Sequence, residues 1–170
     1  VNGGCFDRAV VLVAAHDDSG AMGIIINKQI KDIKSREVLE TMQIKLPKKF
    51  TSMPIYLGGP VDTARGFVIH SSDYEVENTI TYPCGIKISS ERQVLQDYID
   101  GVGPKQLILA LGYAGWVKGQ LENELLDNAW INLPADKDLI FEPNFDAKWQ
   151  KTAQKYGIAI EKIAPTTGLA

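Results

Sequence analysis

Residues 107–125 read LILALGYAGWVKGQLENEL, and this stretch decides the fold. Its first five residues are all apolar, which is typical of a buried β-strand. The glycines that follow predict a turn, and the residues beyond the turn predict a helix that ends near Asp127. A junction of this kind presents free backbone N–H groups and the positive end of a helix dipole. We therefore expect a surface site here.

The segments around this stretch predict more strands than helices. A dense turn signal at 16–20 separates two apolar runs and predicts an antiparallel hairpin. Strands and helices alternate too irregularly for a doubly wound α/β fold. We predict a single α+β domain over residues 1–170, with a mixed, strongly curved, partly barrel-like β-sheet flanked by about four helices. Further strands are expected at 8–15, 21–28, 55–57, 66–70, 79–82, 85–88, 130–133 and 139–141, and further helices at 35–42, 90–99 and 149–156, with loose residues at 165–170.

The composition excludes several classes of protein. The chain has 170 residues, a hydrophobic fraction of 45% and a net charge of −3, which is ordinary globular usage. An acidic chain without a dense basic stripe disfavours direct DNA binding, and the three lysines in 45–49 are expected to be a solvated loop. No apolar run is long enough to cross a membrane. We expect a cytoplasmic protein in which Cys5 and Cys84 are free thiols.

The glycine-rich junction allows two interpretations. Gly112 and Gly115 either bind a phosphate or carboxylate through their backbone N–H groups, or they only permit a tight turn beneath Tyr113 and Trp116. The spacing matches neither a dinucleotide fingerprint nor a phosphate loop. Both interpretations therefore stay open.

The predicted helix after the junction has two faces. Val117, Leu121 and Leu125 recur at helical spacing and are expected to face the core. One residue earlier, the positions 116, 120 and 124 form a second face with aromatic, amide and carboxylate groups. That face is either the wall of a cleft or an ordinary boundary face with a solvated Glu124.

No residue pattern in the chain predicts a metal or a cofactor. His16 and His70 are the two histidines, and neither has the spacing of a zinc ligand set. Asn27 and the Gly58-Gly59 pair end predicted strands and are turn residues by default. They would be functional residues if they line the same pocket as the Gly112 turn. We expect no metal site and no cofactor.

Five motifs in this order resemble the bacterial YqgE/AlgH family. They are Phe6-x-Arg8, His16-x-x-x-Gly20-Ala21-x-Gly23 with Asn27, Gly58-Gly59-Pro60-Val61, Gly66-Phe67-x-x-His70, and the run from Gly112 to Glu124. The resemblance covers nearly the whole chain. It implies a bacterial cytosolic domain with an α+β, partly barrel-like sheet, and an extra first strand before Phe6 that is either absent or cut in this sequence. One branch of the family is named a regulator of exopolysaccharide production and is described as a transcriptional regulator.

We weigh three functions. The first is a non-catalytic regulatory protein that binds a small ligand or a protein partner. The second is an enzyme acting on a small molecule in a cleft at the 112–124 turn and helix, with His70 and Glu124 as base and acid. The third is direct DNA binding, which the charge disfavours. The first is favoured, because glycine, amide and tryptophan residues bind ligands more readily than they transfer protons. The candidate binding residues are Asn27, Gly58, Gly59, His70, Gly112, Tyr113, Gly115, Trp116, Gln120 and Glu124.

Overall fold

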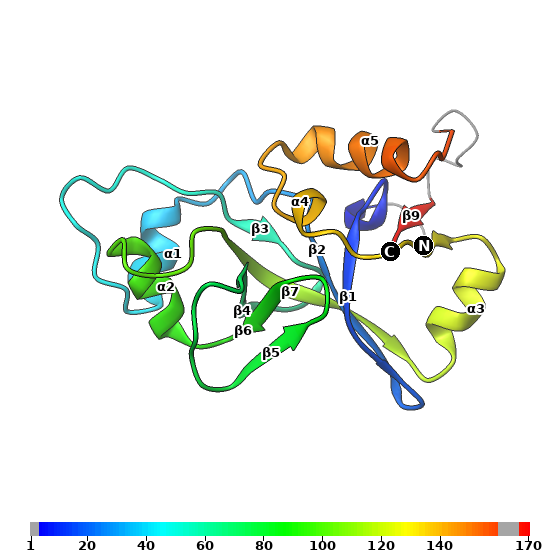
Figure 1. Cartoon of the computed structure of the whole chain (residues 1–170), viewed down its shortest axis with the longest axis horizontal. Helices are drawn as coiled ribbons and strands as arrows, with labels where there is room; N and C mark the ends of the chain where they lie inside the picture. Colours follow the sequence, from blue (N-terminus) through cyan, green and yellow to red (C-terminus); the bar gives the residue numbers. More distant parts are fainter. Residues whose placement is uncertain (1–3, 160–166) are drawn as a thin grey trace.

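The computed structural model describes residues 4–159 and 167–170. It confirms the predicted α+β class, with a curled, half-barrel β-sheet and helices packed around it (Figure 1). The strand order is β1-β2-β7-β4-β6-β5, with antiparallel neighbours, and β3 adds to β7 in parallel. The strands of this sheet are β1 (Val11–Asp17), β2 (Gly20–Ile25), β3 (Tyr56–Leu57), β4 (Val61–Ser71), β5 (Thr79–Tyr82), β6 (Ile86–Ser89) and β7 (Leu107–Val117).

Three clusters of buried apolar side chains hold the helices to this sheet. The first cluster packs α4 (Lys137–Ile140) and α5 (Phe145–Lys155) through residues such as Ile140 and Trp149. The second cluster lies under α1 (Ser35–Thr41) and α2 (Arg92–Ile99), and the third lies under α3 (Gln120–Leu126). Figure 1 shows α1 and α2 at one end of the molecule, α3 at the other, and α5 between them. A short 3₁₀ helix, η1 (Gly4–Phe6), precedes the sheet.

β7 serves all three clusters, and its side chains change faces at Gly112. Before Gly112, Ile108 belongs to the first cluster and Leu109 to the second, as strand alternation requires. Beyond Gly112 the parity is reversed, since Tyr113 packs against the first cluster and Trp116 is buried in the third. Gly112 has φ +79°, a left-handed conformation that glycine adopts without steric cost. Both halves of β7 therefore contact the first cluster, and the opposite face passes from the second cluster to the third at this one left-handed residue.

The turn predicted from residue 112 lies further along the chain. The structure continues β7 to Val117 and pairs its last residues with β2, so the helix begins only at Gln120. The predicted helical stripe of Val117, Leu121 and Leu125 is therefore wrong. Leu121 is buried, but Val117 is a strand residue with 72% of its surface exposed. Gly112 adopts a left-handed conformation within the strand, and the ladder to β2 begins beyond it at Ala114, which periodicity alone cannot reveal.

Two further expectations are wrong. Residues 139–141 form no strand, because Asp136 caps a short helix, α4, by accepting from the backbone N–H groups of Asp138 and Leu139. The C-terminal residues 168–169 are not loose, because β9 (Gly168–Leu169) pairs in parallel with β8 (Trp130–Ile131). Leu169 is completely buried and also bridges to Val10. Residues 165 and 166 lie outside the described part.

Some expectations concern parts of the chain that the structure does not describe. The extra family strand would precede residue 4, and the side chain of Cys5 is not described. Cys84 is a free, half-buried thiol. No helix among residues 4–159 and 167–170 is both long and apolar enough to span a membrane.

Candidate functional site

Asn27 is a buried polar residue that fixes the chain before β1. Its Oδ1 accepts from the backbone N–H of Val10 at 2.8 Å, and its Nδ2 donates to the carbonyl of Arg8 at 2.8 Å. Both bonds replace those that water would otherwise make, so this side chain is satisfied. Arg8 is held with φ +53°, which is uncommon outside glycine and asparagine. Asn27 therefore positions Arg8.

Gly58, Gly59 and Gly112 meet at a close crossing of two backbones. A Cβ on Gly58 would lie 2.2 Å from the carbonyl oxygen of Gly112, and one on Gly112 would lie 2.3 Å from that of Gly59. The Gly58 N–H also donates to the Leu111 carbonyl at 2.8 Å. These glycines are buried, and the backbone on each side occupies the space that a side chain on the other side would need. Their requirement is structural, which favours the second interpretation of the glycine motif.

Tyr113 and Gly115 continue the strand beyond this crossing. The ring of Tyr113 packs edge-on against Phe67, with a centroid separation of 5.9 Å. Gly115 is exposed and pairs with Met22 of β2, and a Cβ there would meet only the Tyr113 ring at 3.6 Å. Nothing in this geometry requires a glycine at position 115.

Trp116, Gln120 and Glu124 come together, but as a closed hydrogen-bonded cluster. Glu124 Oε2 accepts from the indole N–H of Trp116 at 2.7 Å and from that of Trp130 at 2.9 Å. Gln120 donates to Glu124 Oε1 at 3.1 Å and accepts from the Val117 N–H at 3.0 Å. Each group that could bind a ligand is already paired with a neighbour. The predicted cleft wall is therefore an internal brace between β7 and α3.

The two histidines lie in different surroundings. His16, on the exposed end of β1, is hydrogen-bonded through Nε2 to the Glu122 carboxylate of α3. His70 is completely buried in β4, and its Nδ1 donates to the Ser71 carbonyl at 2.8 Å. Burial lowers the pKa of His70, and its Nε2 has no partner among the described residues.

His70 does not line a common pocket with the other predicted site residues. It pairs with Leu107, at the start of β7, whereas Gly115 lies near its end. The intervening strand corresponds to about 26 Å of extended chain. His70 and Glu124 are consequently placed apart, and the predicted acid and base pair is not assembled. Among the candidate residues, the one that borders a cavity described below is Asn27.

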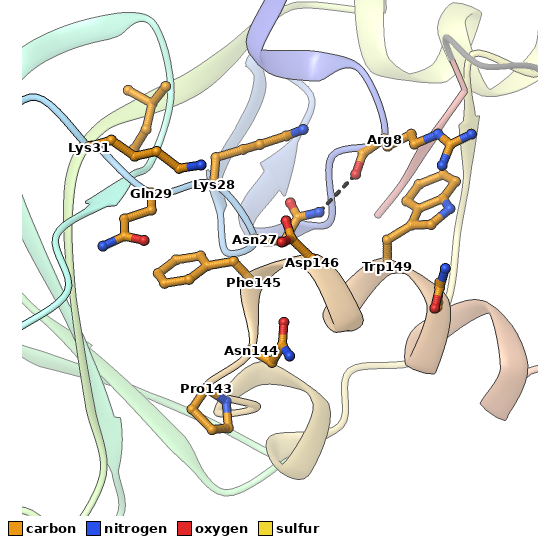
Figure 2. A pocket seen from close by; sticks show the side chains of 12 residues that line it. Arg8, Asn27, Lys28, Gln29, Lys31, Pro143, Asn144, Phe145, Asp146 and Trp149 are labelled. Atoms are coloured by element: carbon orange, nitrogen blue, oxygen red, sulfur yellow. Dashed lines mark hydrogen bonds between the residues drawn. The ribbon is translucent and has the colours of Figure 1, made fainter.

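That cavity has a volume of about 760 Å³ and lies between the end of β2 and the beginning of α5 (Figure 2). Arg8 and Trp149 stand at one end of it, and Gln29 and Lys31 stand at the other. The start of α5 forms its floor, where the Asn144 side chain caps the helix by accepting from the Ala147 N–H at 3.0 Å. The remaining lining residues are Lys28, Leu57, Pro143, Phe145, Asp146 and Gln150.

The charged residues that line this cavity are predominantly cationic. Arg8, Lys28 and Lys31 border it, against one carboxylate, Asp146. The Nζ of Lys28 donates to the Asp7 carbonyl at 2.6 Å. The beginning of α5 adds the positive end of a helix dipole. An anionic group fits this combination.

Lys148 is buried behind the cavity and holds together the elements that form its wall. It is completely buried, and its Nζ donates to the carbonyls of Ile26 and Ile140 at 2.6 and 2.7 Å. It also lies 5.2 Å from the centroid of the Tyr56 ring. Burial lowers its pKa to about 7, against a smaller opposing effect of Glu142. This side chain ties α5 to the end of β2 and to α4.

Sequence reasoning missed this basic cavity. The cations come from two separate segments, and the floor comes from a third that is more than one hundred residues away. The spacing Lys28-x-x-Lys31-x-x-Lys34 was the available signal, but the lysines at 45–49 are more closely spaced in the sequence. Within the described residues, no group of three or more His, Cys, Asp and Glu side chains could hold a metal ion.

The fold and this cavity define a small α+β protein with a curled sheet and a cavity bordered by three cationic side chains. Its relatives give the family. The AlgH-like family model matches residues 1–161, so the chain belongs to the AlgH-like family. A UPF0301 protein of Afipia carboxidovorans is 40% identical over 97% of this chain and 82% of its own length. A UPF0301 protein of Bradyrhizobium diazoefficiens is 45% identical over 90% and 75%, respectively.

Solved structures agree with this assignment. The solution structure of the AlgH protein from Pseudomonas aeruginosa is 35% identical, has a TM-score of 0.77, and covers 90% of this chain and 81% of its own. Protein DIP2367 from Corynebacterium diphtheriae has a TM-score of 0.67 at 17% identity, over 87% of this chain and 77% of its own, which shows a shared fold. The family resemblance predicted from the motifs is therefore confirmed.

Proposed function

We propose that this protein is a non-catalytic, cytoplasmic regulatory protein that binds an anionic ligand group in the cavity between β2 and α5. One observation carries the proposal: Arg8, Lys28 and Lys31 border this cavity in a chain whose net charge is −3. Three cations collected around one cavity, against the overall charge, concentrate positive potential where a ligand enters. The expected ligand carries a carboxylate or phosphate group.

The backbone of Arg8 supports this proposal. A left-handed conformation in a residue other than glycine costs free energy, and such residues are concentrated at binding sites. At Arg8 the cost is offset by the Asn27 hydrogen bond to its carbonyl. Trp149 also borders the cavity, and its buried indole N–H has no partner among the described residues. A strained cation and an unpartnered donor in one wall are more typical of a binding site than of inert surface.

The same geometry gives less support to the enzyme hypothesis. Its proposed base, His70, is buried in β4 opposite the first residue of β7, and its proposed acid, Glu124, accepts hydrogen bonds from two indoles. Neither group borders the basic cavity. Binding therefore accounts for the geometry better than proton transfer by this pair. A regulatory protein of this type would respond to the concentration of its ligand.

A titration with citrate tests the proposal. We expect saturable changes in the amide ¹H–¹⁵N spectrum at residues 27–31 and 144–146. Lys31→Gln is expected to weaken this binding by about two- to fivefold, as the loss of one exposed charge contact implies. Lys118→Gln removes an exposed charge beyond β7 and serves as the matched control.

Two results would contradict the proposal. The first is a citrate titration that leaves the amide signals around the cavity unchanged. The second is an equal loss of affinity in the Lys31 and Lys118 variants, which would indicate attraction to net charge alone.

A further inference from the structure

A second cavity continues the first along the segment that follows β2. It has a volume of about 580 Å³ and lies between this segment and residues 51–55. Gln29 and Lys31 line both cavities, so the two adjoin at these residues. Lys34 and Arg36 extend the cationic lining beyond them. We call the two adjoining cavities the basic groove.

The charge of the basic groove is strongly one-sided. Five cationic side chains border it, against the single carboxylate of Asp146; the cations are Arg8, Lys28, Lys31, Lys34 and Arg36. Arg36 is partly compensated by Glu40 at 3.8 Å. Lys31 and Lys34 are exposed and have no carboxylate partner within the described part of the chain. A ligand that fills the basic groove would therefore carry more than one negative charge.

The backbone at the junction of the two cavities offers a free sheet edge. Lys28 and Ile30 pair with β3 and its neighbour: the Leu57 N–H donates to the Lys28 carbonyl, and the Ile30 N–H donates to the Ile55 carbonyl, each at 2.9 Å. In an antiparallel pair this pattern turns the N–H and C=O of the residue between, Gln29, away from β3. Neither group has a backbone partner among the described residues.

We propose that the basic groove binds an acidic peptide segment of a partner protein, in extended conformation, with its backbone paired to Gln29. This rests on the proposed anionic ligand of the first cavity and names its class. Main-chain hydrogen bonds at an open edge supply affinity without regard to sequence, and the flanking cations select acidic side chains. Apolar residues of the groove such as Ile33, which is 38% exposed, take the apolar side chains between them.

The aromatic residues of the groove favour a peptide over a single-stranded nucleic acid. Nucleic-acid grooves combine cations with aromatic faces on which bases stack. Here Phe145 is packed against Tyr56, with a centroid separation of 4.4 Å, and Trp149 is only 4% exposed. Within the described lining, no other aromatic side chain borders either cavity. The groove thus offers charge and a backbone edge, but no stacking platform.

The test uses a short labelled peptide of alternating aspartate and valine residues. We expect it to bind the full chain and to slow hydrogen exchange at the Gln29 amide, because that N–H gains a partner. The same peptide with asparagine in place of aspartate, and the acidic peptide with N-methylated backbone amides, are both expected to lose binding. Lys34→Gln is expected to lower the affinity for the acidic peptide by about two- to fivefold but to leave citrate binding unchanged. Lys118→Gln is the control for both ligands.

The outcomes separate this inference from the proposed function. If citrate binds at residues 27–31 but the acidic peptide does not, the peptide inference is wrong and the anion site stands. If neither binds, both fail. If the N-methylated peptide binds as well as the parent, edge pairing is overturned. If a single-stranded oligonucleotide binds more tightly than the peptide and leaves Gln29 exchange unchanged, the groove is a nucleic-acid site instead.

Discussion

The hydroxyl of Tyr82 donates a hydrogen bond to the carbonyl of Ala14 at 2.8 Å and thereby joins β5 to β1, the two ends of the strand order. Ala14 is the unpaired residue of a β-bulge, since Val13 pairs with Gly23 and Ala15 pairs with Met22. The bulge leaves this carbonyl free of the ladder. One side chain thus spans the open seam of the curled sheet.

Replacement of Tyr82 tests the importance of this seam. Tyr82→Phe is expected to lower the free energy of unfolding by about 1–2 kcal/mol, because it leaves the Ala14 carbonyl without its partner. Urea denaturation followed by circular dichroism measures this change. Tyr98→Phe is the matched control, since the Tyr98 hydroxyl has no partner among the described residues. Equal stabilities of the two variants would mean that water replaces the Tyr82 hydroxyl at no cost.

The glycines at 112 and 115 are expected to respond differently to alanine. Gly112→Ala places a Cβ 2.3 Å from the Gly59 carbonyl oxygen and forces alanine into a left-handed conformation, which alone costs about 1–2 kcal/mol. Gly115→Ala meets only an ordinary contact at 3.6 Å. Thermal unfolding should show a large loss for the first variant and nearly none for the second. A sharp loss at Gly115 would contradict the exposed strand position.

Glu124 is expected to be a stability determinant. Glu124→Ala leaves the indole N–H groups of Trp116 and Trp130 without their acceptor, which costs about 2–4 kcal/mol for two buried donors. Gln120→Ala removes one side-chain donor from Glu124 and should cost about 1 kcal/mol. Denaturant titration with tryptophan fluorescence measures both variants. Loss of citrate or peptide binding in Gln120→Ala, with stability unchanged, would instead place a ligand site at α3.

Stability is expected to depend on pH through Lys148. Its pKa is about 7 in the folded protein against 10.5 for the ordinary group, so between these values the unfolded chain binds more protons. The free energy of unfolding therefore rises as the pH increases from 7, by at most about 1.4 kcal/mol per pH unit. Below pH 7 this contribution levels off. Tyr56, with a pKa raised to about 12, reverses the trend above pH 10, where the unfolded tyrosine ionises first.

The matched measurement is the unfolding free energy of the wild type and of Lys148→Met between pH 7 and 9.5. The variant loses two buried hydrogen bonds and is expected to be less stable at pH 9.5. The unfolding free energy of the variant is also expected not to rise between pH 7 and 9.5. An identical slope in both proteins would mean that Lys148 keeps its proton in the folded state.

The fold could be predicted where local pattern and tertiary structure agree. The hairpin of β1 and β2, and the apolar first half of β7, follow directly from hydrophobic runs and turn residues. Residues 114–125 could not be predicted correctly, because Val117, Leu121 and Leu125 fit a helical period although Val117 lies in a strand. The short run at 139–141 is apolar enough for a strand, and Asp136 decides in favour of a helix.

The candidate site was less predictable than the fold. Asn27 was identified as a strand-end residue, and its role depends on a contact with Arg8 that spacing does not reveal. The basic groove is assembled by tertiary structure from cations that are dispersed in the sequence. Trp116 and Glu124 do meet, but they meet across a strand-to-helix turn rather than on one helical face.

The reversal of faces at Gly112 makes β7 two modules joined at one residue. A shift in the register of β7 before Gly112 would change which of its side chains enter the second cluster. It would leave the pairing of residues 114–117 with β2 unchanged. Chimaeras between members of this family should therefore be spliced at Gly112. A junction placed there takes the whole second cluster from one parent, because every residue of that cluster precedes Gly112, whereas the first and third clusters draw on both sides of it.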